Sequence, residues 1–294
     1  MLVTGAAGFL GSHVADAFVA AGHDVLAYDM ATVSGHASVR GDLLDAATLV
    51  AAAHGRDVIC HLAAIGDVYL AGRDPALAAT ANVVGTARVC DAAQAAGAKV
   101  VLASTWEVYG RGRADPVDED HPCEPDHPYN ITKLAAERLG LSYFHLRGLP
   151  VIALRLGTAY GTRMRQNSVF SRFIDRALRG EPIQIHGSGD QTRQFTHTSD
   201  IAGAFTQAAH SENAGRVYNV VADEVISIRD LAERVARTIP AEVTFGPARP
   251  GDVPSLRVTS ERAQRELGWR ARMAFDLGLE RIIEERRTQL TPVL

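Results

Sequence analysis

The chain has 294 residues, of which 47% are hydrophobic and 22% are charged, and its formal net charge is −4. This balance is that of an ordinary soluble globular protein and gives no reason to expect nucleic acid or an anionic membrane as a partner. Three cysteines, Cys60, Cys90 and Cys123, show no metal-ligand spacing, and no apolar run approaches a membrane span. We therefore expect a reduced, cytoplasmic enzyme or binding protein without a metal site.

The chain begins with a short apolar strand at residues 2–4, a glycine-rich turn and a helix over about residues 12–21. Gly5 allows the tight turn, Gly8 lets the backbone approach a pyrophosphate, and Gly11 lets helix and strand pack closely. The helix N-terminus offers unpaired N–H groups and the positive end of a dipole to that anion. The pattern predicts a dinucleotide site whose pyrophosphate is held by Gly5, Gly8, Phe9, Leu10 and Gly11.

Strands and helices continue to alternate after the glycine-rich turn. A second strand at residues 24–28 ends at Asp29, whose carboxylate would bind a ribose 2′-hydroxyl and repel a 2′-phosphate, which favours NAD over NADP. A helix over residues 45–53 and an apolar strand over residues 57–62 follow, and His61 in that strand is interpreted as structural. The alternation predicts an α/β fold with a Rossmann-type, doubly wound parallel sheet.

Chemistry is expected beyond the next strand, residues 98–103, in the segment from Ser104 to Gly110. Ligands bind beyond the carboxyl ends of the strands in open α/β sheets, and here a hydroxyl and a carboxylate stand two residues apart, at Thr105 and Glu107. Side chains alternate in an extended chain, so these two would share a face and Trp106 would point away.

A helix from Tyr129 to about residue 145 carries a candidate acid–base pair. Tyr129 and Lys133 are four residues apart and therefore lie on one helical face. A free tyrosine, with a pKa of about 10, is a poor base at neutral pH. A nearby ammonium group and a positively charged nicotinamide ring would favour the phenolate and lower that pKa. The pair could then remove a proton from a substrate hydroxyl while hydride passes to NAD.

The regular alternation loosens in the last third. We expect an NAD-binding domain over residues 1–160, to which residues 195–222 return, and a smaller, mixed α/β portion over residues 161–294 that binds substrate. The loop over residues 111–128 carries carboxylates that we interpret as solvated, namely Asp115, Asp118, Glu119, Asp120, Glu124 and Asp126.

Nearly the whole chain resembles the extended short-chain dehydrogenase/reductase family, in its nucleotide-sugar epimerase and dehydratase branch. The matching positions are Gly5, Gly8, Gly11, Asp29, Gly41, Asp42, His61 to Ala64, Asn82 to Thr86, Ser104, Thr105, Val108 to Gly110, Tyr129, Lys133, Arg193 and Phe195. The resemblance implies a tightly held NAD that is reduced and reoxidised within one cycle, and a homodimer that pairs helices at about residues 76–96 and 129–146. It extends the expected cofactor site to Asp42, Leu43, Leu62, Ala63, Ala64, Asn82, Tyr129 and Lys133.

The resemblance also assigns roles in the reaction. Tyr129 is the acid/base, Lys133 binds the nicotinamide ribose and tunes Tyr129, and Thr105 orients the reacting oxygen of the substrate. Arg193 and Arg249 correspond to arginines that hold the nucleotide diphosphate, which suits their guanidinium groups. Further expected substrate contacts are Asn167, at the base or diphosphate, Thr158, where the family more often has asparagine, and Trp106.

Trp106 decides which reaction we favour. In the dehydratases and decarboxylases of this branch an acid or hydroxyl precedes the glutamate that corresponds to Glu107, whereas Trp106 has no proton suited to general acid catalysis. The indole is expected to form a wall for the sugar or nicotinamide, or to pack in the core. We therefore favour a nucleotide-sugar epimerase over a 4,6-dehydratase or sugar-acid decarboxylase that uses Glu107 as base. A non-catalytic NAD-sensing relative is the alternative of another class.

Overall fold

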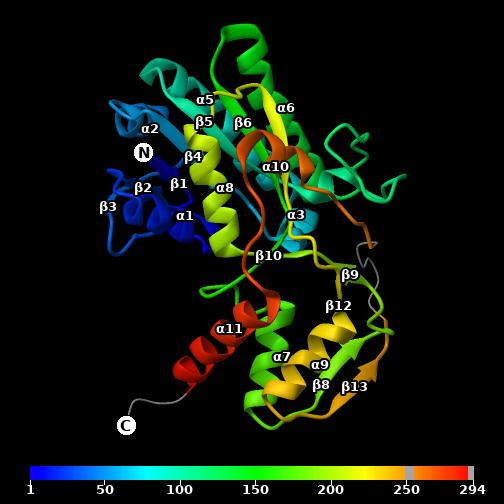
Figure 1. Cartoon of the computed structure of the whole chain (residues 1–294). Coiled ribbons are helices and arrows are strands. Elements are labelled where there is room, and N and C mark those ends of the chain that lie inside the picture. Colours follow the sequence, from blue (N-terminus) through cyan, green and yellow to red (C-terminus); the bar gives the residue numbers. More distant parts are fainter. Residues whose placement is uncertain (249–254, 291–294) are drawn as a thin grey trace.

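The computed structural model describes residues 1–248 and 255–290, and Figure 1 shows a larger lobe above a smaller one. The elements are β1 (Leu2–Thr4), α1 (Phe9–Ala20), β2 (Leu26–Asp29), β3 (Ala37–Arg40), α2 (Ala46–Ala53), β4 (Val58–His61), α3 (Val68–Arg73), α4 (Pro75–Ala79), η1 (Thr80–Val84), α5 (Gly85–Ala96), β5 (Lys99–Thr105), η2 (Trp106–Tyr109), α6 (Pro128–Arg147), β6 (Val151–Leu156), β7 (Thr158–Tyr160), α7 (Val169–Leu178), β8 (Ile183–His186), β9 (Thr192–Arg193), β10 (Phe195–His197), α8 (Thr198–His210), β11 (Arg216–Val220), β12 (Ile226–Ser227), α9 (Ile228–Thr238), β13 (Val243–Gly246), α10 (Glu261–Leu267) and α11 (Phe275–Leu290). The segment η1 is a π-helical turn and η2 is a 3-10 turn.

The larger lobe is built on a seven-stranded sheet with the order β11-β6-β5-β4-β1-β2-β3, in which every pair is parallel. The chain runs outward from β1 to β3 and then crosses to β4, so the strand order reverses between β1 and β4. Ligands of open α/β sheets bind at such a point, beyond the carboxyl ends of the strands. The predicted Rossmann-type doubly wound sheet is confirmed.

Helices cover both faces of this sheet (Figure 1). Successive strand side chains point to opposite faces, so Val3 packs in the core beneath α1 and α8, whereas its neighbour Leu2 packs in the core beneath α2 and α5. Parallel strands that are buried on both faces consist of nearly continuous apolar runs, and this is why the strands could be recognised in the sequence as apolar runs.

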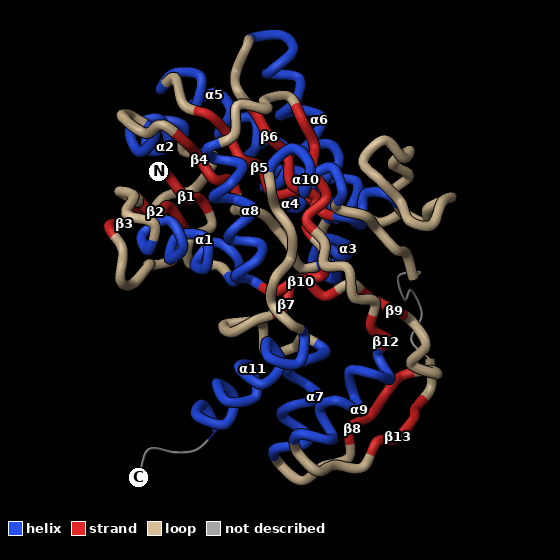
Figure 2. The backbone as a smooth tube through the Cα atoms, in the orientation of Figure 1, coloured by secondary structure: helices blue, strands red, loops and turns tan. Residues whose placement is uncertain are grey.

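The smaller lobe contains the parallel pair β8–β13 with α7, α9 and α11 (Figure 2). Its core includes Phe170 and Ile174 of α7, Leu231 of α9, and Ile282 of α11. The predicted smaller, mixed α/β portion is thus present, while α8 and β11 belong to the larger lobe. The division at residue 160 stays a prediction. No described helix has the length and apolar character needed to cross a membrane.

The first helix begins earlier than predicted. Helix α1 starts at Phe9 rather than near Ser12. Gly8 is the N-cap residue, and no side chain caps the helix. Ser12 instead lies inside the first turn, where its hydroxyl donates to the carbonyl of Phe9. The helix N-terminus therefore opens directly from the glycine-rich turn, which is the arrangement an anion site requires.

Candidate active site

A cavity of about 690 Å³ lies at the carboxyl ends of the central strands, where the strand order reverses. It is bordered by the glycine-rich turn, by the segments that follow β2, β4 and β5, and by α6. Its lining includes Gly5, Gly8, Phe9, Leu10, Gly11, Asp29, Asp42, Leu43, Leu62, Ala63, Ala64, Thr105, Trp106, Glu107, Tyr129, Lys133 and Thr158. Nearly all the residues predicted for cofactor and catalysis thus border one cavity.

The glycine-rich turn fits a dinucleotide because its glycines leave no room for side chains. Gly5 has φ +73°, and a Cβ on it would lie 2.6 Å from the backbone nitrogen of Ala63. A Cβ on Gly11 would lie 2.0 Å from the carbonyl oxygen of Gly5. The turn, the β4 segment and the start of α1 are therefore in close backbone contact, and the N-terminus of α1 borders the cavity. A pyrophosphate binds at such a helix N-terminus in this fold class.

Two carboxylates are fixed at the adenosine end of the predicted NAD site. Asp29, at the end of β2, accepts hydrogen bonds from the backbone N–H groups of Ala7 at 3.0 Å and Ala31 at 2.9 Å. Asp42 accepts from the N–H of Leu44 at 3.0 Å, and its carbonyl accepts from the hydroxyl of Tyr28 at 2.8 Å. Asp29 is therefore held beside the glycine-rich turn, where it can bind a ribose hydroxyl.

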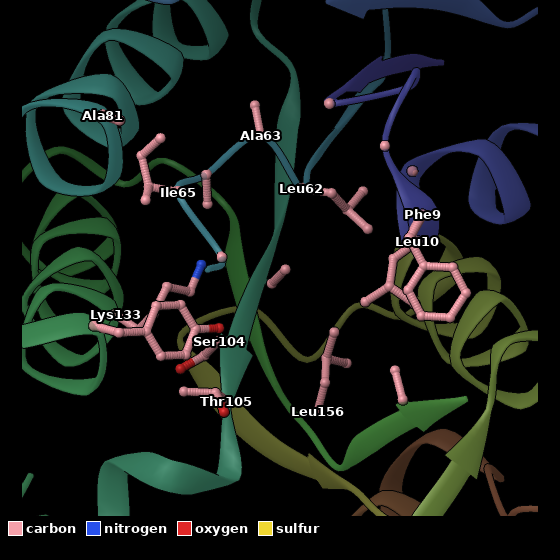
Figure 3. Close-up of a pocket in the computed structure, with 18 of the residues that line it drawn as sticks. Phe9, Leu10, Leu62, Ala63, Ile65, Ala81, Ser104, Thr105, Lys133 and Leu156 are labelled. Atoms are coloured by element: carbon pink, nitrogen blue, oxygen red, sulfur yellow. The ribbon is translucent and has the colours of Figure 1, made fainter. Parts of the chain in front are cut away.

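The predicted catalytic residues border the other end of the cavity. Figure 3 shows Ser104, Thr105 and Lys133 on one side of it, and Phe9 and Leu10 on the other. Thr105 ends β5, and the pair Tyr129 and Lys133 lies in the first turns of α6. A strand end and a helix start thus bring a hydroxyl, a phenol and an ammonium group together.

Burial and charge set the ionisation of this group. Burial raises the pKa of Tyr129, the Glu107 carboxylate raises it further, and the Arg165 guanidinium and a hydrogen bond with Thr105 lower it. Burial lowers the pKa of Lys133 to about 8. From the sequence we expected Lys133 and a bound nicotinamide ring to lower the pKa of Tyr129. In the structure, the Arg165 guanidinium is a cation that lowers it.

The expected side-chain alternation past the strand is wrong. The extended chain ends at Thr105, and the 3-10 turn η2 follows, with the N–H of Glu107 donating to the Thr105 hydroxyl at 3.3 Å. Because the chain curls here, Trp106 borders the cavity together with its two neighbours. Trp106 also packs in an apolar cluster with Tyr109 and Val117, so it is both a cavity wall and a core residue.

Glu107 is a half-buried carboxyl group that borders the cavity. Burial raises its pKa, while the positive charge of Arg193 lowers it. Arg193, in β9, therefore lies close enough to act electrostatically on the predicted catalytic end. However, Arg193 is not among the described residues that line the cavity.

Two asparagines also lie outside the described cavity lining. Asn82 is buried, and its amide bonds to the N–H of Ile65 at 2.7 Å, the carbonyl of Ile65 at 3.2 Å and the hydroxyl of Thr132 at 2.9 Å. These bonds tie the loop after β4 to helix α6. The cofactor-binding role of Asn82 stays a prediction. Asn167 is exposed just before α7, and Arg249 lies outside the described residues.

Two structural interpretations from the sequence have different outcomes. His61 is buried and bonds to the hydroxyls of Thr4 at 2.7 Å and Thr86 at 3.1 Å, as expected of a structural histidine. The interpretation of Glu119 as solvated is wrong, because it is buried and accepts from the N–H of Asn219 at 2.7 Å. The other five carboxylates of that loop are exposed, as predicted.

Sequence reasoning missed several residues that border the cavity. They include Tyr28, Ile65, Gly66, Leu156, Gly157, Met164, Arg165 and Ser168. Arg165 matters most, since it acts on Tyr129 and donates to the carbonyl of Gly66 at 3.2 Å. Nothing local separates it from the other arginines of the chain, whereas Leu156 and Gly157 could have been found from their place at the end of a strand.

Comparison with known proteins identifies the group to which this architecture belongs. Residues 1–221 match the model of the NAD dependent epimerase/dehydratase family. The chain belongs to that family. Its members catalyse reactions with NAD, so this protein is a NAD-dependent enzyme of the epimerase and dehydratase group with the predicted cofactor type.

Individual relatives carry out more than one reaction. The chain is 34% identical to a UDP-glucose 4-epimerase of Mycolicibacterium smegmatis, over 96% of this chain and 97% of the relative. It is 32% identical to a dTDP-glucose 4,6-dehydratase of Streptomyces griseus, over 92% and 88% of the two chains. The solved structure of MoeE5 in complex with UDP-glucuronic acid and NAD superposes with a TM-score of 0.91 at 37% identity, over 98% of this chain and 99% of that chain.

Proposed function

We propose that this member of the family is a nucleotide-sugar 4-epimerase that acts on a UDP-linked hexose or hexuronate. The observation that carries the proposal is the arrangement of Thr105, Tyr129 and Lys133 at one end of the cavity, with Trp106 beside them where a proton donor would be needed for dehydration. The UDP-sugar epimerase relative and the MoeE5 complex support the substrate class.

The residues suit a cycle of oxidation and reduction at one sugar carbon. Bound NAD supplies the hydride acceptor and later the donor, so that a transient ketone can be reduced from its other face. Tyr129 takes the proton from the sugar hydroxyl and returns it to the ketone oxygen, and Thr105, which borders the same end of the cavity, orients that oxygen. The Lys133 ammonium stabilises the phenolate form of Tyr129 and can donate to the cofactor ribose.

Products distinguish the three candidate reactions. We expect the purified protein, incubated with UDP-glucose, UDP-glucuronate, UDP-N-acetylglucosamine, dTDP-glucose and GDP-mannose, to convert a UDP-sugar into an isomer of the same mass. Mass spectrometry detects loss of water or carbon dioxide, and NMR of the sugar ring detects inversion at one carbon. Loss of water would show a dehydratase, and loss of carbon dioxide a decarboxylase, and either result would contradict the proposal.

Glu107→Gln tests the base that those alternatives require. An epimerase should keep its activity, and its pH–rate profile should move to lower pH, because a neutral glutamine no longer raises the pKa of Tyr129 and the phenolate forms earlier. The measurement is kcat/KM against pH. A dehydratase would instead lose about 10²-fold or more in rate. Glu124→Gln, the same change at an exposed carboxylate, should leave the profile in place.

We also propose that the protein is a cytoplasmic homodimer. Helices α5 and α6 pack against each other, and two apolar side chains near them are partly exposed: Val84, just before α5, is 45% exposed and Ile131, in α6, is 48% exposed. Burial of these apolar side chains against a second copy would stabilise a dimer. Sedimentation velocity should give twice the chain mass for the wild type and a shift toward the monomer for Ile131→Glu, whereas an unchanged sedimentation coefficient would contradict this interface.

A further inference from the structure

Helix α6 carries a buried carboxylate one turn beyond the catalytic pair. Lys133 and Glu137 are four residues apart, and side chains at this spacing share one helical face. Lys133 is 6% exposed and borders the cavity, whereas Glu137 is 1% exposed and lies behind it in the protein interior. The proposed reaction uses Tyr129 and Lys133 but assigns nothing to Glu137.

Three hydrogen bonds fix this carboxylate in place. Glu137 Oε2 accepts from the Ser104 hydroxyl at 2.6 Å and from Arg155 Nε at 3.0 Å, and its Oε1 accepts from Arg155 Nη2 at 2.6 Å. Ser104 lies on β5 next to Thr105, and Arg155 lies on β6 with 2% exposure. The carboxylate therefore has a fixed position relative to both the catalytic strand and the catalytic helix.

We propose that Glu137, held by Arg155 and Ser104, is a positioning residue that keeps Lys133 in its charged ammonium form at the catalytic end of the cavity. The inference rests on the proposed role of Lys133 in catalysis. A buried lysine loses its charge unless a negative group lies nearby. Glu137 is such a group, and it is anchored independently of the lysine.

The groups that surround Lys133 support this assignment. Burial lowers the pKa of Lys133 to about 8, and Glu137 raises it. His61, on β4, interacts with Lys133 but is itself neutral, because burial lowers its pKa to about 3. Tyr129, on the same helix, is neutral because burial raises its pKa, and Ser104 on β5 carries no charge. Without Glu137, the remaining influences would favour the neutral amine.

A purely structural ion pair makes a different prediction. The guanidinium of Arg155 also donates to the Tyr109 hydroxyl at 2.8 Å, which in turn donates to Asn219 Oδ1 at 2.7 Å, so the cluster links several strands. If this linkage were its whole function, changes at Glu137 would alter stability but not the ionisation of Lys133. The ionisation of Lys133 is therefore the quantity to measure.

The sequence makes this measurement direct, because lysine occurs only at positions 99 and 133. In holoenzyme labelled with ¹³C,¹⁵N-lysine and carrying Lys99→Arg, the side-chain NMR signal of Lys133 reports its protonation as pH is varied. We expect Glu137→Gln to lower the titration midpoint by about one pH unit. A midpoint that stays in place would overturn the proposal.

A second variant covers loss of folding, since Glu137→Gln leaves a buried Arg155 without its partner. The double variant Glu137→Gln/Arg155→Met should lower the midpoint in the same direction but by less, because the Arg155 cation, which favours the neutral amine, is removed together with the carboxylate. The matched control Asp175→Asn/Arg286→Met removes a largely buried ion pair between α7 and α11. It should lower the melting temperature without moving the midpoint.

The outcomes separate this proposal from the proposed reaction. The NMR midpoint needs no turnover, so it is readable whichever nucleotide sugar the enzyme uses. An equal midpoint in wild type and in the double variant would show that the ion pair is structural only. A lowered midpoint, with the alkaline limb of kcat moving by the same amount, would establish Glu137 as the residue that maintains the charge of Lys133.

Discussion

Tyr129→Phe is expected to lower turnover by about 10²–10⁴-fold, the range in which a positioned acid–base group contributes to a rate. The substitution removes the oxygen that we propose takes the sugar proton, while the ring remains to fill the same space. NAD should stay bound, because the glycine-rich turn and Asp29 are untouched. Steady-state kinetics on the active UDP-sugar, together with release of NAD on denaturation, measures both quantities.

Tyr143→Phe is the matched control for this experiment. It makes the same change on the same helix, at a hydroxyl that bonds to Asp91 at 2.8 Å and lies outside the cavity lining given for the described residues. We expect turnover near that of wild type and a loss of about 1 kcal/mol in stability. Near-normal turnover in Tyr129→Phe would remove Tyr129 as the acid/base and would favour a non-catalytic NAD-binding protein or a different base.

Gly11→Ala is expected to abolish tight NAD binding. Its Cβ would lie 2.0 Å from the carbonyl oxygen of Gly5 and 2.6 Å from the Gly5 carbonyl carbon, so the start of α1 must move away from the glycine-rich turn. That shift displaces the N–H groups that face the pyrophosphate, so we expect NAD affinity to fall by at least about 10-fold, equivalent to about 1.4 kcal/mol. Fluorescence titration with NADH and the NAD content of the purified protein would show the loss.

Gly203→Ala provides the comparison for the glycine change. Gly203 lies within α8, and a Cβ there would meet no atom within 4 Å. Alanine is favoured over glycine in a helix by about 1 kcal/mol, so this variant should keep NAD and unfold at a slightly higher temperature. If Gly11→Ala held NAD as tightly as Gly203→Ala, the close contact at the turn would not be essential to the cofactor site.

The parts of the site that were predictable depend on local geometry. Gly5, Gly11 and Asp29 follow a strand, a helix start and a second strand, and that order places them together in any parallel βαβ unit. Tyr129 and Lys133 share a face because of the helical repeat alone. These relations need no information about the remainder of the chain.

Glu119 and Asn82 show what local reasoning missed. Glu119 stands among five exposed carboxylates, yet it is buried because β11 brings the N–H of Asn219 to it from 100 residues away. Asn82 matched a family position, and its amide also bonds to Ile65 and Thr132. In both cases the hydrogen-bond partners lie well outside the local segment, so the neighbouring residues in the sequence do not indicate that the side chain is buried or bonded.

The sequence by itself determined the parallel sheet, the cofactor turn and the Tyr129–Lys133 pair, because strand alternation and helical periodicity fix these over short distances. Only the tertiary structure decided that Trp106 borders the cavity, that Arg165 lies near enough to lower the pKa of Tyr129, and that Glu137 is bound by Arg155 behind Lys133. Each of these depends on which strand ends and loops meet, and on how burial strengthens the few charges enclosed there. Such effects arise from packing between distant segments rather than from the local order of residues.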